Sequence, residues 1–197
     1  MSILLASASP QRSAILTQLE IPFRVIAPEV EELDMGTPSE VALHNGRLKA
    51  AAVAEHAGED ELILACDTLV DVDGIPFGKP ANAEEAFTML TLLRGRTHDV
   101  VGGIVLVHAS TGRMHERAVR TKVRFRDFPD DLLQRYLDGG EWNGRAGGYA
   151  IQGTGAAMVS GIGGDYQNVV GLPVSMLLSL LEEEPGWNDL ARSVVAV

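Results

Sequence analysis

Residues 61–80 read ELILACDTLVDVDGIPFGKP, and this stretch predicts the centre of a sheet. The four apolar residues 62–65 are typical of a strand that is buried on both of its faces. Residues 69–73 then alternate between apolar and polar side chains, and Asp73-Gly74 is a turn signal. We therefore expect a central strand followed by a hairpin.

Asp67 and Thr68 interrupt this pattern where the buried strand should reach the edge of the core. A carboxylate at the end of a buried strand costs free energy unless a metal, a cation or a reaction uses it. Lys79 follows twelve residues later, between Gly78 and Pro80 in a stiff, extended segment. These residues alone support a functional site and an ordinary turn cap with a solvated lysine equally well.

The composition is that of an acidic, globular chain. It has 197 residues, 46% of them hydrophobic, which suits one domain with room for two lobes. The net charge of −11 argues against a nucleic-acid polymer as partner. A phosphorylated small molecule still fits, provided that cations or Mg²⁺ line its site. Lysine is rare, so the positions of Lys49 and Lys79 beside candidate site elements are informative.

Cys66 is the single cysteine of the chain, which excludes an internal disulfide and a cysteine-based zinc site. We expect it to pack as a small apolar residue. The apolar run at residues 3–6 is too short for a signal peptide, and no run approaches membrane-spanning length. We therefore expect a cytoplasmic protein with no membrane partner, and a homodimer stays open.

Periodicity and capping signals place the other elements. Ser9-Pro10 and Thr37-Pro38 are helix starts with proline at the first helical position. The expected helices span residues 9–20, 37–56, 82–93, 129–137 and 172–185, and the further expected strands span residues 2–6, 23–27, 99–107, 117–125 and 156–162. Because strands and helices mix without strict βαβ order, we expect a mixed α/β or α+β domain over residues 1–184. A loose C-terminal tail should follow over residues 185–197.

Ser7, Ser9 and Arg12 form a second candidate site. A strand delivers two hydroxyl groups to a helix N-terminus, where free amides and the helix dipole favour an anion. The guanidinium of Arg12, one turn into the helix, could clamp a phosphate. Taken alone, this motif is more typical of an ordinary capped surface helix.

Several other motifs lack residues that the sites they resemble require. Residues 74–79 imitate a phosphate-binding loop, but the spacing of the glycines is one residue short and Pro80 follows the lysine. Gly153-Thr154-Gly155 lacks the third glycine of a dinucleotide loop. The five histidines show no paired metal spacing. What remains is a set of hydroxyls, cations and an acidic loop at residues 29–34, which suits a polyphosphate bound with magnesium.

The chain resembles the Maf family of nucleoside triphosphate pyrophosphatases, also described as septum-formation inhibitor proteins. The resemblance covers residues 3–181 and rests on six landmarks in order: LASASPQR (5–12), LKA (48–50), ACDTLV (65–70), GKP (78–80), AGGYAIQG (146–153) and GDYQNVVGLP (164–173). It implies a long twisted mixed β-sheet flanked by helices, with two lobes around a deep cleft, like that of inosine triphosphatases. It also implies hydrolysis between the α- and β-phosphates with a divalent metal, Mg²⁺ or Mn²⁺.

The resemblance also implies roles for individual residues. Asp67 matches the proton acceptor of the family, although metal ligation stays open as its role because a carboxylate is a weak base. Glu32 matches an acidic position that helps to hold the metal, with Glu31 as the alternative register. Lys49 and Lys79 match lysines that face the phosphates. The phosphate-binding start of the first helix corresponds to Ser7, Ser9 and Arg12.

Substrate preference follows from three positions. Arg12, Thr68 and Gln152 match the branch of the family that acts on dTTP and UTP, and a hydroxyl and an amide can pair with the edge of a pyrimidine. Modified pyrimidine triphosphates stay open as substrates.

Three departures from the family pattern bear on affinity and preference. Gln11 replaces the usual first arginine of the SPRR pattern, Gly102 stands where threonine is common, and Gly144-Arg145 stands where Asp-Lys usually precedes AGGY.

Two other functions remain. One is a non-catalytic, nucleotide-binding regulator of septum formation that works through a protein partner. The other is an inosine-type triphosphatase, which is disfavoured because residues 6–12 lack the expected Thr-x-Asn-x-x-Lys start.

Overall fold

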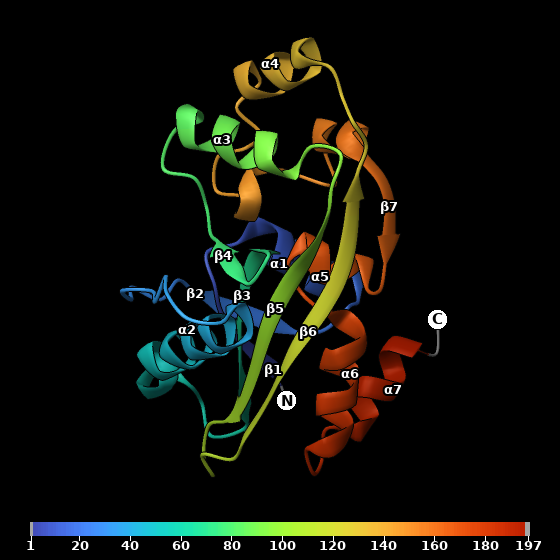
Figure 1. Ribbon diagram of the computed structural model, residues 1–197. Coiled ribbons are helices and arrows are strands. Elements are labelled where there is room, and N and C mark those ends of the chain that lie inside the picture. Colours follow the sequence, from blue (N-terminus) through green and yellow to red (C-terminus); the bar gives the residue numbers. More distant parts are fainter. Residues whose placement is uncertain (1, 196–197) are drawn as a thin grey trace.

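The computed structural model describes residues 2–195, which fold around a seven-stranded mixed sheet (Figure 1). The strand order is β2-β1-β3-β5-β6-β7, and β4 pairs with β3 as a short hairpin. β2, β1 and β3 run parallel, whereas every other pairing is antiparallel. The strands are β1 (Ser2–Ala6), β2 (Phe23–Ile26), β3 (Glu61–Val72), β4 (Ile75–Phe77), β5 (Thr97–His108), β6 (Met114–Phe125) and β7 (Val159–Gly163).

Seven α-helices and three 3₁₀ turns occur within the described residues. The helices are α1 (Pro10–Gln18), α2 (Pro38–Val53), α3 (Ala83–Leu93), α4 (Asp130–Asp138), α5 (Tyr166–Val170), α6 (Val174–Glu183) and α7 (Asn188–Val195). The 3₁₀ turns are η1 (Ala54–His56), η2 (Ala146–Gly148) and η3 (Thr154–Met158). The capping signals account for two helix starts: Asn82 accepts a hydrogen bond from Glu85 N, and Glu40 accepts one from Thr37 N.

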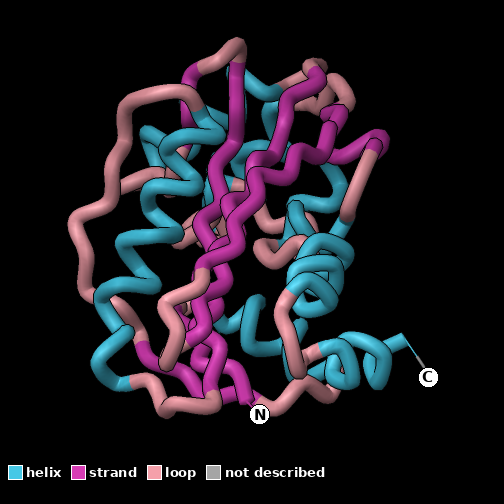
Figure 2. The backbone as a smooth tube through the Cα atoms, turned by 90° about the horizontal axis from the view of Figure 1, so that it is seen from below, coloured by secondary structure: helices cyan, strands magenta, loops and turns pink. Residues whose placement is uncertain are grey.

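The sheet is covered on both faces at the end that holds β1. Figure 2 shows the strands in the middle, with α2 on one side and the C-terminal helices on the other. Leu62 and Leu64 pack with α1, α6 and α7, whereas Ile63 and Ala65 pack with α2. The prediction that residues 62–65 are buried on both faces is therefore confirmed.

A second core lies at the other end of the long strands. There the far halves of β3, β5 and β6 pack with α3, α4 and residues 146–159, and Phe125 and Tyr149 contact each other edge to face at 4.9 Å. Figure 1 shows α3 and α4 together at this end, well away from α2 and α6. The molecule thus has two lobes that share three strands of twelve residues each.

Two expectations about these elements are wrong, and a third is correct only in part. β3 runs without interruption through Asp67, so this residue does not lie at a strand end. The expected loose tail is helical where the structure describes it: α7 covers residues 188–195, and Trp187 and Ala191 are buried against the core that contains α6. The strand expected at residues 156–162 is also shifted, because η3 occupies its first part and β7 begins at Val159. The assignment of residues 1–184 as one domain stays a prediction.

Candidate active site

A cleft of about 630 Å³ opens between the two lobes. Every residue that the sequence predicted for a site lines this cleft. These residues are Ser7, Ser9, Arg12, Glu32, Lys49, Asp67, Thr68, Lys79 and Gln152. They come from segments that are far apart in the chain, so the tertiary fold brings them together.

The position of the cleft follows from a gap along one edge of β3. β1 pairs with β3 only as far as Ala65, and β4 begins to pair at Val70. Among the described residues no strand covers the edge between these points, where Asp67 and Thr68 lie. The chain leaves β1 at Ala6 and turns into α1, which brings the start of that helix to the same gap.

Two glycines opposite this gap let helices approach the sheet closely. Gly103 pairs with Asp67, and a β-carbon at this position would overlap the backbone of Ala42 in α2. Gly102 pairs with Thr68, and a β-carbon there would overlap the side-chain amide of Asn168 in α5. The glycine pair therefore allows α2 to reach one face of the strand and α5 to reach the other.

The carboxylate of Asp67 is buried and held at both oxygens. Lys49 Nζ lies 2.7 Å from Oδ1, and Asn45 Nδ2 donates to Oδ2 at 3.1 Å. Lys49 Nζ also lies 2.9 Å from Glu32 Oε1. One ammonium thus bridges the two carboxylates that the sequence predicted as metal ligands, and this pairing offsets the cost of burying Asp67.

Asn45 is a site residue that the sequence analysis missed. Its side chain is 1% exposed, donates to the carbonyl of Leu33 at 3.0 Å and accepts from the amide of Leu33 at 2.8 Å. It therefore ties the acidic loop to α2 and to Asp67 at once. Two signals could have identified it: asparagine is a poor residue for a helix interior, and a spacing of four places it on the same helix face as Lys49.

Arg12 is buried and has three partners. Nε donates to the carbonyl of Gly171 at 2.8 Å, Nη1 to Ser7 Oγ at 3.0 Å, and Nη2 to Thr68 Oγ1 at 3.1 Å. The guanidinium therefore links α1, β3 and the segment after α5. Ser9 is the N-cap residue of α1, but its hydroxyl donates to Gln11 instead of accepting from the helix amides.

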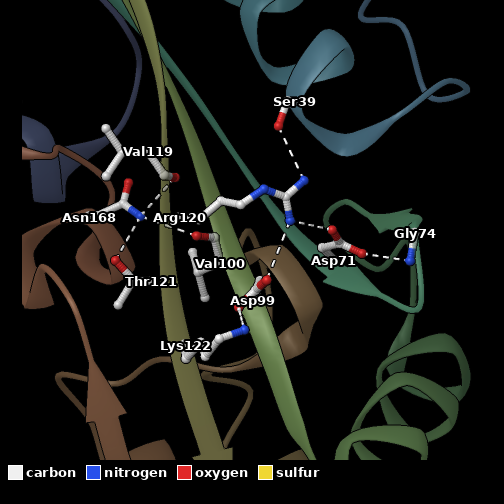
Figure 3. Close-up of polar contacts among 10 residues, drawn as sticks. All are labelled: Ser39, Asp71, Gly74, Asp99, Val100, Val119, Arg120, Thr121, Lys122 and Asn168. Atoms are coloured by element: carbon white, nitrogen blue, oxygen red, sulfur yellow. Dashed lines mark hydrogen bonds and ion pairs between the residues drawn. The ribbon is translucent and has the colours of Figure 1, made fainter.

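Asn168 anchors the segment that supplies Gly171 (Figure 3). Its side chain is fully buried, and Nδ2 donates to Val100 O, Val119 O and Thr121 Oγ1 at 3.1–3.3 Å. α5 is thereby fastened to β5 and β6. The departure at Gly102 makes this contact possible, because any larger residue would displace the Asn168 amide.

The wall from the second lobe has a different character. Lys79 and Gln152 are exposed, and neither side chain has a hydrogen-bond or ion-pair partner within residues 2–195. The backbone beside Lys79 is fixed by a hydrogen bond of 2.9 Å from Gly147 N to Gly78 O. The side chain of Tyr149 is also held, because its hydroxyl lies 2.9 Å from His98 Nε2. Burial lowers the pKa of His98 to about 4 and raises that of Tyr149.

Cys66, next to Asp67, takes no part in the site. It is fully buried among apolar side chains, and this burial raises the pKa of its thiol to about 11. A thiol with such a pKa is a poor nucleophile at neutral pH. The prediction that Cys66 packs as an apolar residue is confirmed.

The wall of the cleft that carries Asp67 and Glu32 fits a magnesium ion. The described residues hold no group of three or more acidic, histidine or cysteine side chains that would form a complete metal site. Asp67 and Glu32, however, both reach the same ammonium and present two carboxylates to the cleft. Mg²⁺ commonly takes one or two carboxylates, with phosphate and water oxygens as the other ligands.

No helix within the described part of the chain has the length and apolarity to cross a bilayer.

Comparisons with known proteins identify the family of the chain. The family model described as Maf-like protein matches residues 2–184. A dTTP/UTP pyrophosphatase of Caldanaerobacter subterraneus is 42% identical over 98% of this chain and 93% of its own. A dTTP/UTP pyrophosphatase of Thermococcus kodakarensis is 41% identical over 96% of this chain and 100% of its own.

A solved structure, that of the Staphylococcus aureus Ham1 protein, superposes with a TM-score of 0.46 and 18% identity, covering 64% of this chain and 73% of that one. A likeness at this level is too weak to bear on the fold or the function. The family match extends over nearly the whole described chain, and the predicted resemblance is confirmed: the chain belongs to the Maf-like protein family.

Proposed function

We propose that this chain is a nucleoside triphosphate pyrophosphatase that converts dTTP and UTP into the nucleoside monophosphate and pyrophosphate. The relatives at 41–42% identity bear that name and align over nearly the whole chain. The observation that carries the proposal is the cluster of Asp67, Lys49 and Glu32 in a cleft that Lys79 also lines. A cytoplasmic location and a homodimer stay predictions.

In the proposed reaction, water attacks the α-phosphorus, and the bond from this atom to the oxygen that bridges to the β-phosphate breaks. Asp67 accepts a proton from the water, and pyrophosphate leaves with the bridging oxygen. Lys49 and Asn45 each occupy one carboxylate oxygen, and a carboxylate has further lone pairs for the water proton. The base is therefore oriented before the substrate binds.

Mg²⁺, or Mn²⁺ in its place, would be held by Asp67 and Glu32 together with phosphate oxygens. Such an ion neutralises charge on the phosphates and lowers the pKa of a water that it binds. Lys79 completes the arrangement, because its ammonium has no partner within residues 2–195 and is free to pair with a phosphate.

The substrate preference rests on Thr68 and Gln152, which both line the cleft. Arg12 donates to the oxygen of the Thr68 hydroxyl, so the proton of this hydroxyl is free to donate to the pyrimidine ring of the substrate. The exposed amide of Gln152 can both donate and accept. We assign Arg12 to orienting Thr68, with its remaining N–H groups available to phosphate.

The substitution Asp67→Asn tests this proposal. With dTTP or UTP and Mg²⁺, we expect turnover to fall roughly 10²–10⁴-fold, the usual contribution of a positioned base. Asp73→Asn is the matched control, because Asp73 lies in an exposed turn with φ of 54°, which asparagine tolerates. Retained turnover in Asp67→Asn, or release of orthophosphate in place of pyrophosphate, would contradict the proposal.

The same experiment separates the two other functions. Faster hydrolysis of ITP than of dTTP would indicate an inosine-type enzyme. A regulator that works through a partner would keep its effect on septum formation in Asp67→Asn. An exposed apolar patch near Trp142 or Trp187 would favour such a regulator. Trp187 is 3% exposed and packs in the core, and Trp142 is partly buried against the core at the other end of the long strands.

A further inference from the structure

Four cationic side chains line the cleft within the described residues, and they divide into two pairs. Arg12 and Lys49 are engaged by protein groups, as described above. Lys79 and Arg145 also line the cleft, yet within residues 2–195 neither side chain makes a hydrogen bond or an ion pair. Lys79 already has a proposed role, whereas Arg145 has none.

The side chain of Arg145 has a buried hydrogen-bond donor that no described protein group satisfies. Its Nε is buried and has no hydrogen-bond acceptor in the described structure. Glu141 lines the same cleft, but its carboxylate accepts from Thr154 N at 2.9 Å instead of pairing with the arginine. A buried donor without an acceptor costs free energy, and a ligand in the cleft that accepts from it would remove this cost.

The backbone holds Arg145 on the same wall as Lys79. Its own amide donates to Trp142 O at 3.2 Å, and its carbonyl accepts from Gly148 N at 3.0 Å. Two residues further on, Gly147 N donates to Gly78 O at 2.9 Å, which joins the turn to the segment that carries Lys79. Gly147 has φ of 65°, and a β-carbon there would lie 2.6 Å from Val70 Cγ2 of β3. The two cations therefore come from adjacent, fixed segments.

We propose that Arg145 is a substrate-binding residue that pairs with the β- and γ-phosphates, beside Lys79. A nucleoside triphosphate brings up to four negative charges into a cleft that three carboxylates, Glu32, Asp67 and Glu141, already line. Lys49 is paired with two carboxylates, and Arg12 already donates three hydrogen bonds to protein oxygens. Among the described residues, Lys79 and Arg145 are therefore the lining cations whose donors are all available to the leaving pyrophosphate. A guanidinium presents a planar fork of donors that matches phosphate oxygens. This inference rests on the proposed function.

The test compares Arg145→Ala and Arg145→Lys with the control Arg135→Ala. Arg135 is an exposed residue of α4 whose ion-pair partner is Asp131 four residues earlier, so the control removes the same charge outside the cleft. In the presence of Mg²⁺, inhibition of UTP hydrolysis is measured with pyrophosphate and, separately, with UMP. Calorimetry measures the binding of pyrophosphate directly.

For Arg145→Ala we expect the inhibition constant of pyrophosphate and the KM for UTP to rise roughly tenfold or more, the loss of one charge-assisted contact. Inhibition by UMP should stay within about twofold, and Arg145→Lys should recover part of the pyrophosphate affinity. A purely structural role would weaken both inhibitors alike. Unchanged pyrophosphate binding, or an equal loss for UMP, would overturn the inference.

Calorimetry keeps this result separate from that of the proposed function. If the wild-type chain binds UTP and pyrophosphate but does not cleave UTP, the proposed function fails. The role of Arg145 is then still tested by whether Arg145→Ala binds pyrophosphate more weakly than the wild type. If the wild-type chain cleaves UTP and Arg145→Ala binds pyrophosphate normally, the inference about Arg145 fails alone. A wild-type chain that binds neither ligand overturns both.

Discussion

The two walls of the cleft handle charge in opposite ways. On the wall from the first lobe, Ser7, Arg12, Lys49 and Asp67 are each less than 10% exposed, and each has a hydrogen-bond or ion-pair partner. On the wall from the second lobe, Lys79 is exposed, Arg145 is half-buried, and neither has a partner within residues 2–195. The first wall is oriented before the substrate arrives, whereas the second leaves its cations for the substrate.

This difference has a physical basis in burial. A buried charge must be paired to offset its desolvation, so the groups of the first wall position one another and resist movement. A charge that stays in contact with water, such as the ammonium of Lys79, costs little to leave free, and it can follow a flexible polyphosphate. We expect substitutions on the first wall to reduce both stability and turnover, and substitutions on the second to affect binding alone.

The largest contrast should appear between Lys49→Met and Lys79→Met. Lys49→Met leaves Asp67 and Glu32 facing each other without a cation, and we expect it to destabilise the fold by roughly 3–5 kcal/mol. Lys79→Met should change the free energy of unfolding by less than about 0.5 kcal/mol while it raises the KM for UTP. Chemical denaturation without metal, followed by steady-state kinetics, measures both quantities. Equal stability losses in the two variants would remove the distinction between the walls.

The stability of the second lobe should depend on pH through His98, whose Nε2 lies 2.9 Å from the Tyr149 hydroxyl. The pKa of His98 is lowered from 6.5 to about 4 by burial beside Tyr149, with a smaller opposing effect of Asp99. Between these values the unfolded chain binds a proton that the folded chain does not, so stability falls as the pH falls from about 6.5 to about 4. At about 1.4 kcal/mol for each pKa unit, the free energy of unfolding falls by roughly 3 kcal/mol over this interval.

The substitution His98→Gln keeps a hydrogen-bonding side chain but removes this titration. We expect the stability of the variant to depend less on pH than that of the wild type between pH 6.5 and 4, by about the amount above. Unfolding measured across this interval gives both curves, and His56→Gln serves as an exposed control. Parallel curves for wild type and His98→Gln would show that the imidazole is not kept neutral in the fold.

A smaller effect is expected at Asn45. The variant Asn45→Ala loses the contact with Asp67 and leaves the amide and carbonyl of Leu33 without this partner, which should cost roughly 1–3 kcal/mol of stability. Because Asn45 positions the base and does not touch the substrate, kcat should fall roughly tenfold while the KM for UTP changes little. A rise in KM at constant kcat would instead place Asn45 in substrate binding.

Local patterns predicted much of the fold. The apolar run at residues 62–65 indicated a strand buried on both faces, and Asn82 marked the start of a helix where one begins. The pattern failed at Asp67 because a polar residue interrupts a hydrophobic run whether or not the strand ends there. It also failed for residues 188–195: a helix of eight residues is too short to be stable by itself, and α7 is stabilised by the tertiary burial of Trp187 and Ala191.

The candidate site was predictable only in part, for a similar reason. Residue types at spaced motifs pointed to Asp67, Lys49, Lys79 and Arg12, all of which line one cleft. Asn45 was missed because its importance depends on contacts with Leu33 and Asp67, residues that sequence spacing does not relate to it.

The sequence by itself determined the pattern of buried strands and the membership of the Maf-like protein family, because alternation, capping and motif order are local properties of the chain. Only the tertiary structure decided which cations are engaged and which are free. The pairing of Lys49 and Arg12 depends on the register of β3 against β5, which sets Gly103 and Gly102 opposite Asp67 and Thr68 and so brings α2 and α5 close to the sheet. Contacts between segments that are far apart in the sequence determine which side chains form hydrogen bonds and ion pairs. These interactions determine which charged groups stay available to a ligand.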